Sequence, residues 1–116
     1  MKLSFVTLVN DAAQYRRLTD SLLPQLDSER TEVHAIDADR RGWNAARGLN
    51  YGVRASNADF VVCVHQDVIF PDGWYQDFIK QLMKLPANVA AVGTVGVTAR
   101  GAFRGHKVDP HGHKRW

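Results

Sequence analysis

The chain has 116 residues, of which 45% are hydrophobic and 23% charged, and its formal net charge at pH 7 is +3. This length leaves room for one core, and the composition is that of a soluble globular protein. No apolar run is long enough to cross a bilayer and no signal peptide is visible, so we expect a cytoplasmic protein without a transmembrane segment.

The first segment of the chain predicts a strand followed by a helix. Residues 3–9 form a nearly continuous apolar run, which is typical of a strand buried on both faces in a parallel sheet. Asn10 and Asp11 follow, and both are favourable helix N-caps. A helix is predicted over residues 12–26, and Pro24 is expected to bend it or end it early. The expected inner stripe of this helix is Tyr15, Leu18, Leu22 and Leu26.

The next segment predicts a short strand and a second helix. The strand covers residues 33–36 and leads to Asp37, and the helix covers residues 44–55. Gly48 and Gly52 lie on one side of that helix. Because glycine destabilises a helix interior, the pair indicates close backbone approach to a neighbouring element or to a ligand. The expected inner face of the helix is Ala46, Leu49, Asn50 and Val53.

A third strand has the clearest pattern in the sequence. Residues 60–64 are all apolar and run directly into the segment His-Gln-Asp at residues 65–67. The single cysteine, Cys63, lies inside this run. A single cysteine excludes an intrachain disulfide, and we expect Cys63 to be buried as a small hydrophobic residue.

A third helix and a fourth strand complete the predicted elements. The helix covers residues 74–85 and is expected to be capped by Asp72, while Pro86 stops it. The strand covers residues 89–95. The helix is expected to turn inward Phe78, Ile79, Leu82 and Leu85.

Strands that alternate with helices predict an α/β fold with a mostly parallel sheet, in three layers of helix, sheet and helix. Ligands of such sheets bind at the carboxyl ends of the strands. That rule gathers three polar segments at one edge of the sheet, namely residues 10–11, 37–39 and 65–67.

The carboxylate of Asp67 directly follows a buried strand, where it would suit a hard divalent cation that holds a diphosphate. The alternative is that Asp67 caps a turn. His65 alone would be a hydrogen-bonded structural residue. With Gln66 between them, His65 and Asp67 are expected to point to the same side, and together they favour a metal or phosphate site.

The other polar strand ends each have two interpretations. By the same strand alternation, Asp37 and Asp39 are expected to share a face, where they would accept hydrogen bonds from a base or a ribose, or they would pair in a solvated loop with the arginines that follow them. Asn10 and Asp11 are candidates for contact with a nucleoside, or they are helix caps. Arg47 would meet a phosphate from the second helix, or it would serve on the surface.

The order and spacing of these blocks resemble those of GT-A glycosyltransferases of the family 2 type. The His-Gln-Asp segment, followed by an apolar pair and a proline-containing turn into an aromatic-led helix, is similar to the glycosyltransferase-like family 2 branch. The resemblance covers about residues 3–96, and the matching blocks are residues 5–11, 36–37, 44–52, 60–67 and 92–96.

The resemblance implies a Rossmann-like GT-A half that binds a UDP- or GDP-sugar, and inverting transfer of the sugar to an acceptor glycan or another hydroxyl compound. Val9, with the two residues after it, matches the segment that holds the base, and Asp37 matches the acid that contacts uracil or ribose. Asp67 matches the last acid of the Asp-any-Asp motif, which binds metal and diphosphate, while His65 replaces the first acid. The implied cofactor is a divalent cation. A histidine favours manganese over magnesium, or direct contact with phosphate.

The family continues into an acceptor-binding half with a general base, and we find no such base in this sequence. We expect residues 1–98 to form the nucleotide-sugar-binding domain and residues 99–116 to form a basic, mobile tail without a nucleic-acid partner, although such a stretch could also border a phosphate-bearing ligand. The histidines of this tail are His106, His111 and His113, and His111 and His113 could bind a metal. The chain would then be a truncated domain that needs a partner, or a module that binds nucleotide sugar without catalysis.

A further hypothesis is a small oligomeric protein whose function lies in an interface. Trp43, Trp74 and Phe103 would be its exposed anchors, and an open sheet edge would pair two chains. The alternative for these aromatic residues is core packing, which we favour for Trp74.

Overall fold

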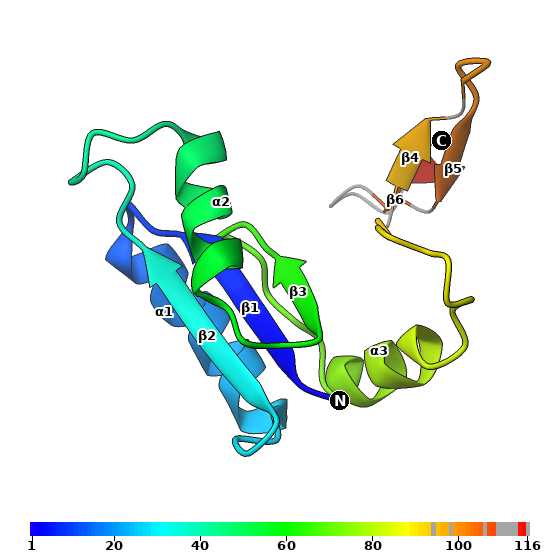
Figure 1. Cartoon of the computed structure of the whole chain (residues 1–116), viewed down its shortest axis with the longest axis horizontal. Coiled ribbons are helices and arrows are strands. Elements are labelled where there is room, and N and C mark those ends of the chain that lie inside the picture. Colours follow the sequence, from blue (N-terminus) through cyan, green and yellow to red (C-terminus); the bar gives the residue numbers. More distant parts are fainter. Residues whose placement is uncertain (94, 98, 106, 109–113, 116) are drawn as a thin grey trace. The chain divides into compact units, whose positions relative to one another are not determined.

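The computed structural model describes residues 1–93, 95–97, 99–105, 107–108 and 114–115. They fall into two compact units, residues 1–83 and 84–116. Figure 1 shows the succession of helices and strands along the chain. No helix in the described ranges is long and apolar enough to span a membrane.

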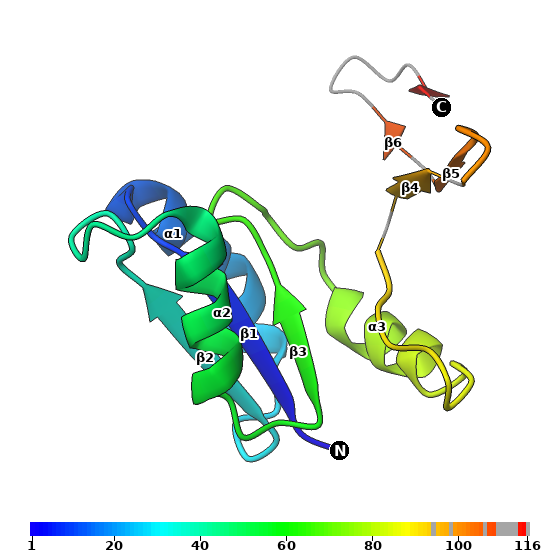
Figure 2. The ribbon, with the colours of Figure 1, turned by 45° about the horizontal axis from the view of Figure 1, so that its top comes forward.

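The first unit is built on a three-stranded parallel sheet. Its strands are β1 (Leu3–Leu8), β2 (Thr31–Ile36) and β3 (Phe60–Cys63), in the order β2-β1-β3. All three strands run in the same direction, so their carboxyl ends meet at one edge of the sheet (Figure 2). The predicted parallel α/β architecture is confirmed, with a longer second strand than expected.

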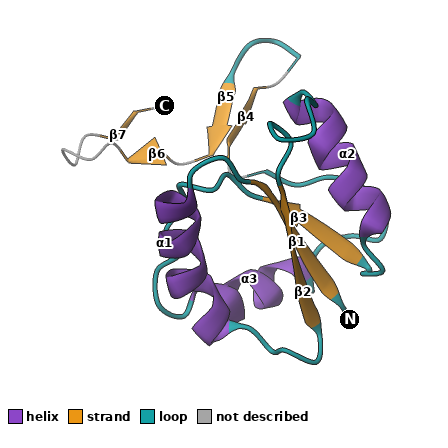
Figure 3. Ribbon diagram, turned by 90° about the vertical axis from the view of Figure 1, so that its left-hand side faces the viewer, coloured by secondary structure: helices purple, strands orange, loops and turns teal. Residues whose placement is uncertain are grey.

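Helices cover both faces of this sheet. The helices α1 (Ala12–Leu22) and α3 (Trp74–Leu82) lie on one face, and α2 (Ala45–Ala55) lies on the other (Figure 3). The predicted three-layer arrangement is therefore confirmed. The buried hydrophobic core lies between β1 and the helices α1 and α3. It contains Leu3, Phe5, Leu18, Leu22 and Phe70.

The first helix agrees closely with its predicted pattern. Leu18 and Leu22 are buried, and Tyr15 and Leu26 pack partly buried against the same core. The α-helix ends at Leu22 and continues as a short 3₁₀ helix, η1 (Leu23–Gln25), with proline in its first turn. This early end is the effect expected of a proline, which lacks the N–H needed to continue the α-helix.

The second helix packs through glycine rather than through large side chains. Gly48 and Gly52 are its buried residues. A Cβ at Gly48 would lie 2.7 Å from Cδ2 of Leu8 and 3.1 Å from Cβ of Ala38, and one at Gly52 would overlap Cγ1 of Val6. The close approach that the glycine pair predicted is confirmed, and the element approached is β1.

This contact reverses the predicted inner face of α2. The predicted face followed helical spacing, whereas the sheet leaves no room for a side chain at the contact. Of the four residues expected inward, Leu49 is half-buried, and the exposed ones are Ala46, Asn50 and Val53.

Strand β3 lies at an edge of the sheet, with β1 as its one strand partner among the described residues. Cys63 is exposed, and Phe60 retains 42% of its accessible surface. The prediction that Cys63 is buried is therefore wrong. It assumed a strand covered on both sides, as an interior strand would be.

The third helix begins after Gly73, which adopts a φ of 79° that a side-chain-bearing residue rarely takes. Gly73 is the N-cap and no side chain caps the helix, so the prediction of Asp72 as the cap is wrong. The helix also ends at Leu82, earlier than predicted, with Met83 as its C-cap. Phe78, Ile79 and Leu82 pack against the core as expected, while Leu85 is 36% exposed.

Trp74 belongs to the core, as we favoured. Its ring stacks on Phe78 with centroids 4.7 Å apart and lies tilted against Phe70 at 4.4 Å. Such pairs contribute beyond the area they bury. Trp74 is therefore not an exposed anchor for a partner.

The second unit contains short antiparallel pairs. β4 (Val95–Val97) pairs with β5 (Phe103–Gly105), and β6 (Lys107–Val108) pairs with β7 (Lys114–Arg115). The strand predicted over residues 89–95 is wrong over residues 89–93, which carry no strand, and residue 94 lies outside the described residues.

The domain boundary predicted after residue 98, and the mobility of the segment beyond it, stay predictions. Short strands occur among the described residues of that segment. The three histidines at positions 106, 111 and 113 lie outside the described residues.

Glu32 on β2 joins three segments at the amino-terminal edge of the sheet. Its Oε1 accepts hydrogen bonds from the Asn57 N–H (3.1 Å) and the Ser56 hydroxyl (3.3 Å), and its Oε2 lies 3.4 Å from Nζ of Lys2. Nε2 of His34 is 3.3 Å from Oε1. The backbone N–H of Asn57, followed by His34 and Lys2, holds the pKa of Glu32 at about 2.

Replacing Gly52 with alanine is expected to lower the free energy of unfolding by about 1–3 kcal/mol, because the added methyl would overlap Val6 in a close-packed contact. Position 50, exposed on the same helix, is the matched control. There, Asn50→Ala should be more stable than Asn50→Gly by about 1 kcal/mol through helix propensity alone. Urea unfolding measures both, and a preference for alanine at position 52 as well would show that the contact does not constrain α2.

Glu32 is expected to make stability depend on pH in the acid range. Its pKa in the folded protein is about 2, below the ordinary 4.5, so its charged form stabilises the fold above about pH 4.5. That contribution is lost as the pH falls from about 4.5 toward 2. Glu32→Gln should therefore lose stability less steeply than wild type over this window, as measured by urea unfolding. Glu29→Gln, at an exposed position before β2, should keep the wild-type slope, and parallel profiles for Glu32→Gln and wild type would contradict the assignment.

Candidate functional site

The carboxyl-terminal edge of the sheet borders a hollow of about 320 Å³. This volume is at the lower end of the range found for small-molecule sites. Most of its lining comes from the end of β1, the loop between β2 and α2 and the turn after β3, and α1 and α2 contribute one residue each. The residues that line it are Leu8, Val9, Asn10, Gln14, Ala38, Asp39, Trp43, Ala45, His65, Gln66 and Asp67.

The side chain of Gln66 ties two walls of this hollow together. Its Oε1 accepts hydrogen bonds from the backbone N–H groups of Asn10 (3.0 Å) and Asp11 (3.1 Å), and its Nε2 donates to Oδ1 of Asn10. A carboxamide carries both an acceptor and donors, which this arrangement requires. Gln66 therefore fixes the turn after β3 against the end of β1.

His65 and Asp67 reach the hollow from a turn rather than from a strand. The Val68 N–H donates to the His65 carbonyl at 3.2 Å, which closes the turn. The strand alternation that was expected to place His65 and Asp67 on one side does not extend this far. Both nevertheless line the same hollow, with Gln66 between them doing so as well.

The loop after β2 does not hold its two carboxylates together. Oδ1 of Asp37 accepts a hydrogen bond from the Arg40 N–H at 2.9 Å, and Asp37 is not among the lining residues. Asp39 lines the hollow. A hydrogen bond from the Trp43 N–H to the Ala38 carbonyl (2.8 Å) closes the loop, so that Trp43 lines the hollow as well. The common face predicted from strand alternation is wrong here because residues 38–42 form turns. A contact of Asp37 with a base or a ribose stays a prediction.

The remaining candidates occupy different places. Val9 and Asn10 line the hollow. Asp11 instead caps α1, with its Oδ1 accepting from the Gln14 N–H at 3.0 Å, as one of its two interpretations predicted. Arg47 lies on α2 and lines a separate hollow, which shares Trp43 with the first.

Sequence reasoning missed the contributions of Gln66 and Trp43. The contact between Gln66 and Asn10 depends on the pairing of β1 with β3, which no local pattern reveals. Trp43 was considered only as an interface anchor or a core residue, whereas it is half-buried at the border of two hollows. The available signal was its position between a polar loop and the helix that the glycines bring to the sheet.

The family model described as "Glycosyl transferase family 2" matches residues 6–113, which is most of the chain. The chain belongs to glycosyl transferase family 2. The resemblance seen in the sequence is thereby confirmed, and it implies glycosyl transfer between a nucleotide-sugar donor and an acceptor in general terms. No curated protein and no solved structure matches the chain.

The family resemblance also implies a divalent cation, and the residues of this glycosyl transferase family 2 domain fit it in part. In the part of the chain that the structure describes, no three His, Cys, Asp or Glu side chains are grouped so that they could hold a metal ion. His65 and Asp67 line one hollow and offer two donors. Magnesium is commonly held by one or two carboxylates together with waters and substrate phosphates. The donor set therefore fits a cation shared with a diphosphate and not a closed protein site.

Replacing Gln66 with leucine is expected to remove all three hydrogen bonds to residues 10 and 11 while keeping a similar volume. The amide protons of Asn10 and Asp11 should then exchange faster with solvent, and the free energy of unfolding should fall by about 1–2 kcal/mol. Gln66→Glu keeps the acceptor oxygen and should retain most of the amide protection. Hydrogen exchange followed by NMR measures both, and equal protection in Gln66→Leu and wild type would mean that the bonds do not form in solution.

Proposed function

We propose that this domain binds a UDP- or GDP-sugar in the hollow at the carboxyl ends of β1 and β3. It transfers the sugar, with inversion, to a hydroxyl group of an acceptor glycan or another compound. The observation that carries the proposal is the gathering of Val9, Asn10, Asp39, His65 and Asp67 around one hollow in a member of this family.

The nucleoside would lie against the end of β1. Leu8 and Val9 offer it half-buried apolar surface, and Trp43 offers an aromatic ring at the rim. Asn10 and Asp39 would accept hydrogen bonds from the base or the ribose hydroxyl groups. Asp37 and Arg47 do not line this hollow.

The diphosphate would lie beside His65 and Asp67. Because the carboxylates of Asp39 and Asp67 both line the hollow, a diphosphate would be repelled unless a cation balances the charge. His65 and Asp67 would hold a manganese or magnesium ion, which neutralises the charge of the leaving diphosphate when it is bound.

In the proposed reaction, the acceptor oxygen bonds to the anomeric carbon while the bond from that carbon to the diphosphate breaks. The electron pair leaves with the diphosphate, and attack from the opposite side inverts the configuration. The proton of the acceptor hydroxyl passes to a general base, which we do not assign to a residue of this chain. His65 and Asp67 orient the leaving group for in-line attack.

UDP or GDP at about ten times its Kd is expected to stabilise the domain by about 1.4 kcal/mol, which raises the Tm by several degrees. Manganese should enlarge the shift. Asp67→Asn should abolish the gain from manganese, whereas Asp20→Asn, at an exposed position on α1, should leave the shift as in wild type. Thermal unfolding monitored by fluorescence measures this, and the absence of any nucleotide shift in wild type would favour the oligomeric interaction protein.

Donor turnover separates catalysis from binding in the same samples. Release of UDP from a UDP-sugar, or of GDP from a GDP-sugar, in the presence of hydroxyl acceptors supports the transferase. A nucleotide-induced shift without release supports a binding module, or a domain that needs a partner to supply the base.

A further inference from the structure

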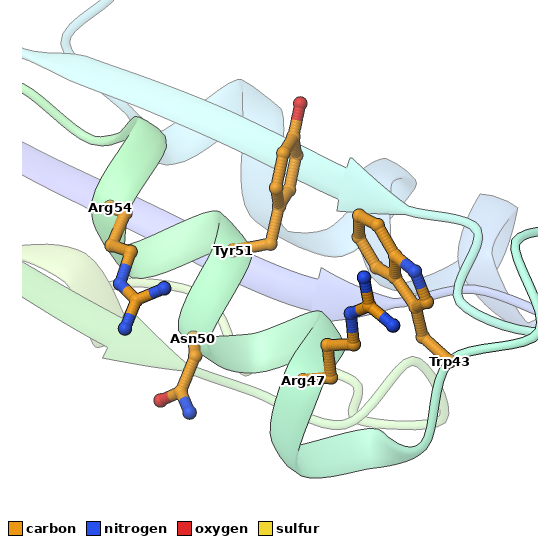
Figure 4. A pocket seen from close by; sticks show the side chains of 5 residues that line it. All are labelled: Trp43, Arg47, Asn50, Tyr51 and Arg54. Atoms are coloured by element: carbon orange, nitrogen blue, oxygen red, sulfur yellow. The ribbon is translucent and has the colours of Figure 1, made fainter.

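A second hollow, of about 400 Å³, lies on the face of α2 that is turned away from the sheet. It is lined by Trp43, Arg47, Asn50, Tyr51 and Arg54. Figure 4 shows four of these side chains extending from α2, with Trp43 extending from the segment just before it. The last four of these residues are exposed, because the glycine contacts turn the opposite side of the helix toward β1.

Two arginine side chains stack on the aromatic rings of this hollow, Arg47 from among its lining residues and Arg41 from outside them. The guanidinium carbon of Arg47 lies 4.8 Å from the ring centroid of Trp43. That of Arg41 lies 4.9 Å from Trp43 and 5.1 Å from Tyr51, and the two rings are 5.1 Å apart. A guanidinium stacked on a ring keeps its N–H donors in its own plane, where they remain free to bind an acceptor.

No carboxylate pairs directly with the arginines of this cluster in the part of the chain that the structure describes. Within the described ranges, Arg41, Arg47 and Arg54 form no ion pair with a carboxylate, whereas Arg30, Lys2 and Lys80 each do. Two guanidinium groups line the hollow, and a third, that of Arg41, stacks on its aromatic residues, so that together they favour a ligand with more than a single negative charge. A phosphate monoester, with about −1.5 to −2 charges and three acceptor oxygens, meets this requirement better than one carboxylate.

We propose that the outer face of α2 is a second binding site, which takes the phosphate group of a ligand other than the nucleotide in the first hollow. Arg41, Arg47 and Arg54 bind the phosphate oxygens, and Asn50 hydrogen-bonds the group that carries the phosphate. The two hollows share Trp43. A ligand bound here therefore lies next to whatever occupies the hollow at the strand ends.

Glycerol 3-phosphate and vesicles that contain phosphatidic acid present the same phosphate monoester from two sources, one soluble and one a lipid surface. Binding is followed by the quenching of tryptophan fluorescence and by vesicle sedimentation. Saturation with at least one probe is expected for wild type. Arg54→Gln and Arg41→Gln should each weaken that binding about tenfold or more, since each removes charge-assisted hydrogen bonds.

Arg17→Gln is the matched control, because it removes the same charge from an exposed position on α1, across the sheet from the site. It should bind the probe as wild type does. Asp67→Asn should also retain probe binding, which keeps this test separate from the nucleotide experiment. Unchanged far-ultraviolet circular dichroism confirms that each variant is folded.

Each result has a fixed consequence. Saturable binding of glycerol 3-phosphate that depends on Arg54 and Arg41 assigns a soluble phosphorylated ligand, and dependence seen only with vesicles assigns a lipid headgroup. The proposal is overturned if wild type binds neither probe. It is also overturned if Arg17→Gln weakens binding as much as Arg54→Gln, which would mean that overall charge alone attracts the probe.

Discussion

The packing of α2 onto β1 through two glycines is the constraint on which both hollows depend. Because no side chain separates the helix from the strand at Gly48 and Gly52, the start of α2 lies close to the end of β1. That placement brings Trp43 and Ala45 to the hollow that the strand ends form. The same contact turns the opposite side of α2, with its arginines, toward solvent. One steric requirement thus positions the hollow at the strand ends and exposes the basic face of α2.

The Gln66 side chain supplies the second constraint and also limits what the hollow can do. Many anion sites use backbone N–H groups at a helix start or a loop. Here the N–H groups of Asn10 and Asp11 already donate to Gln66. They are not available for a diphosphate, so the charge of the proposed donor must be balanced by other groups. For a diphosphate donor, which the family implies, the groups of this hollow that could hold such a balancing cation are His65 and Asp67.

Periodicity was sufficient to predict the parallel sheet and the α1 stripe, because those features depend on apolar spacing along one element. It was not sufficient where the outcome depends on a neighbour. Cys63 is exposed because β3 lies at the edge of the sheet. The order of strands in a sheet cannot be predicted from the sequence of one strand. The prediction also applied the alternation of side chains in a strand to residues that lie beyond the ends of β2 and β3. Asp37 and Asp39 separate because turn geometry replaces the pleat after β2, whereas His65 and Asp67 stay together because Gln66 fixes their turn.

Opposite charges lie on the two sides of Trp43, and they would act on different steps of binding. Arg47 and Arg54 are exposed, so their field attracts an anionic ligand at a distance but is screened over about 8 Å at physiological salt. Asp39 and Asp67 line the neighbouring hollow, where they oppose the same ligand at close range. The arginines would therefore govern how fast an anionic ligand arrives. Whether it stays in the hollow at the strand ends would depend on the cation that His65 and Asp67 are proposed to hold, because without that charge the two carboxylates favour dissociation.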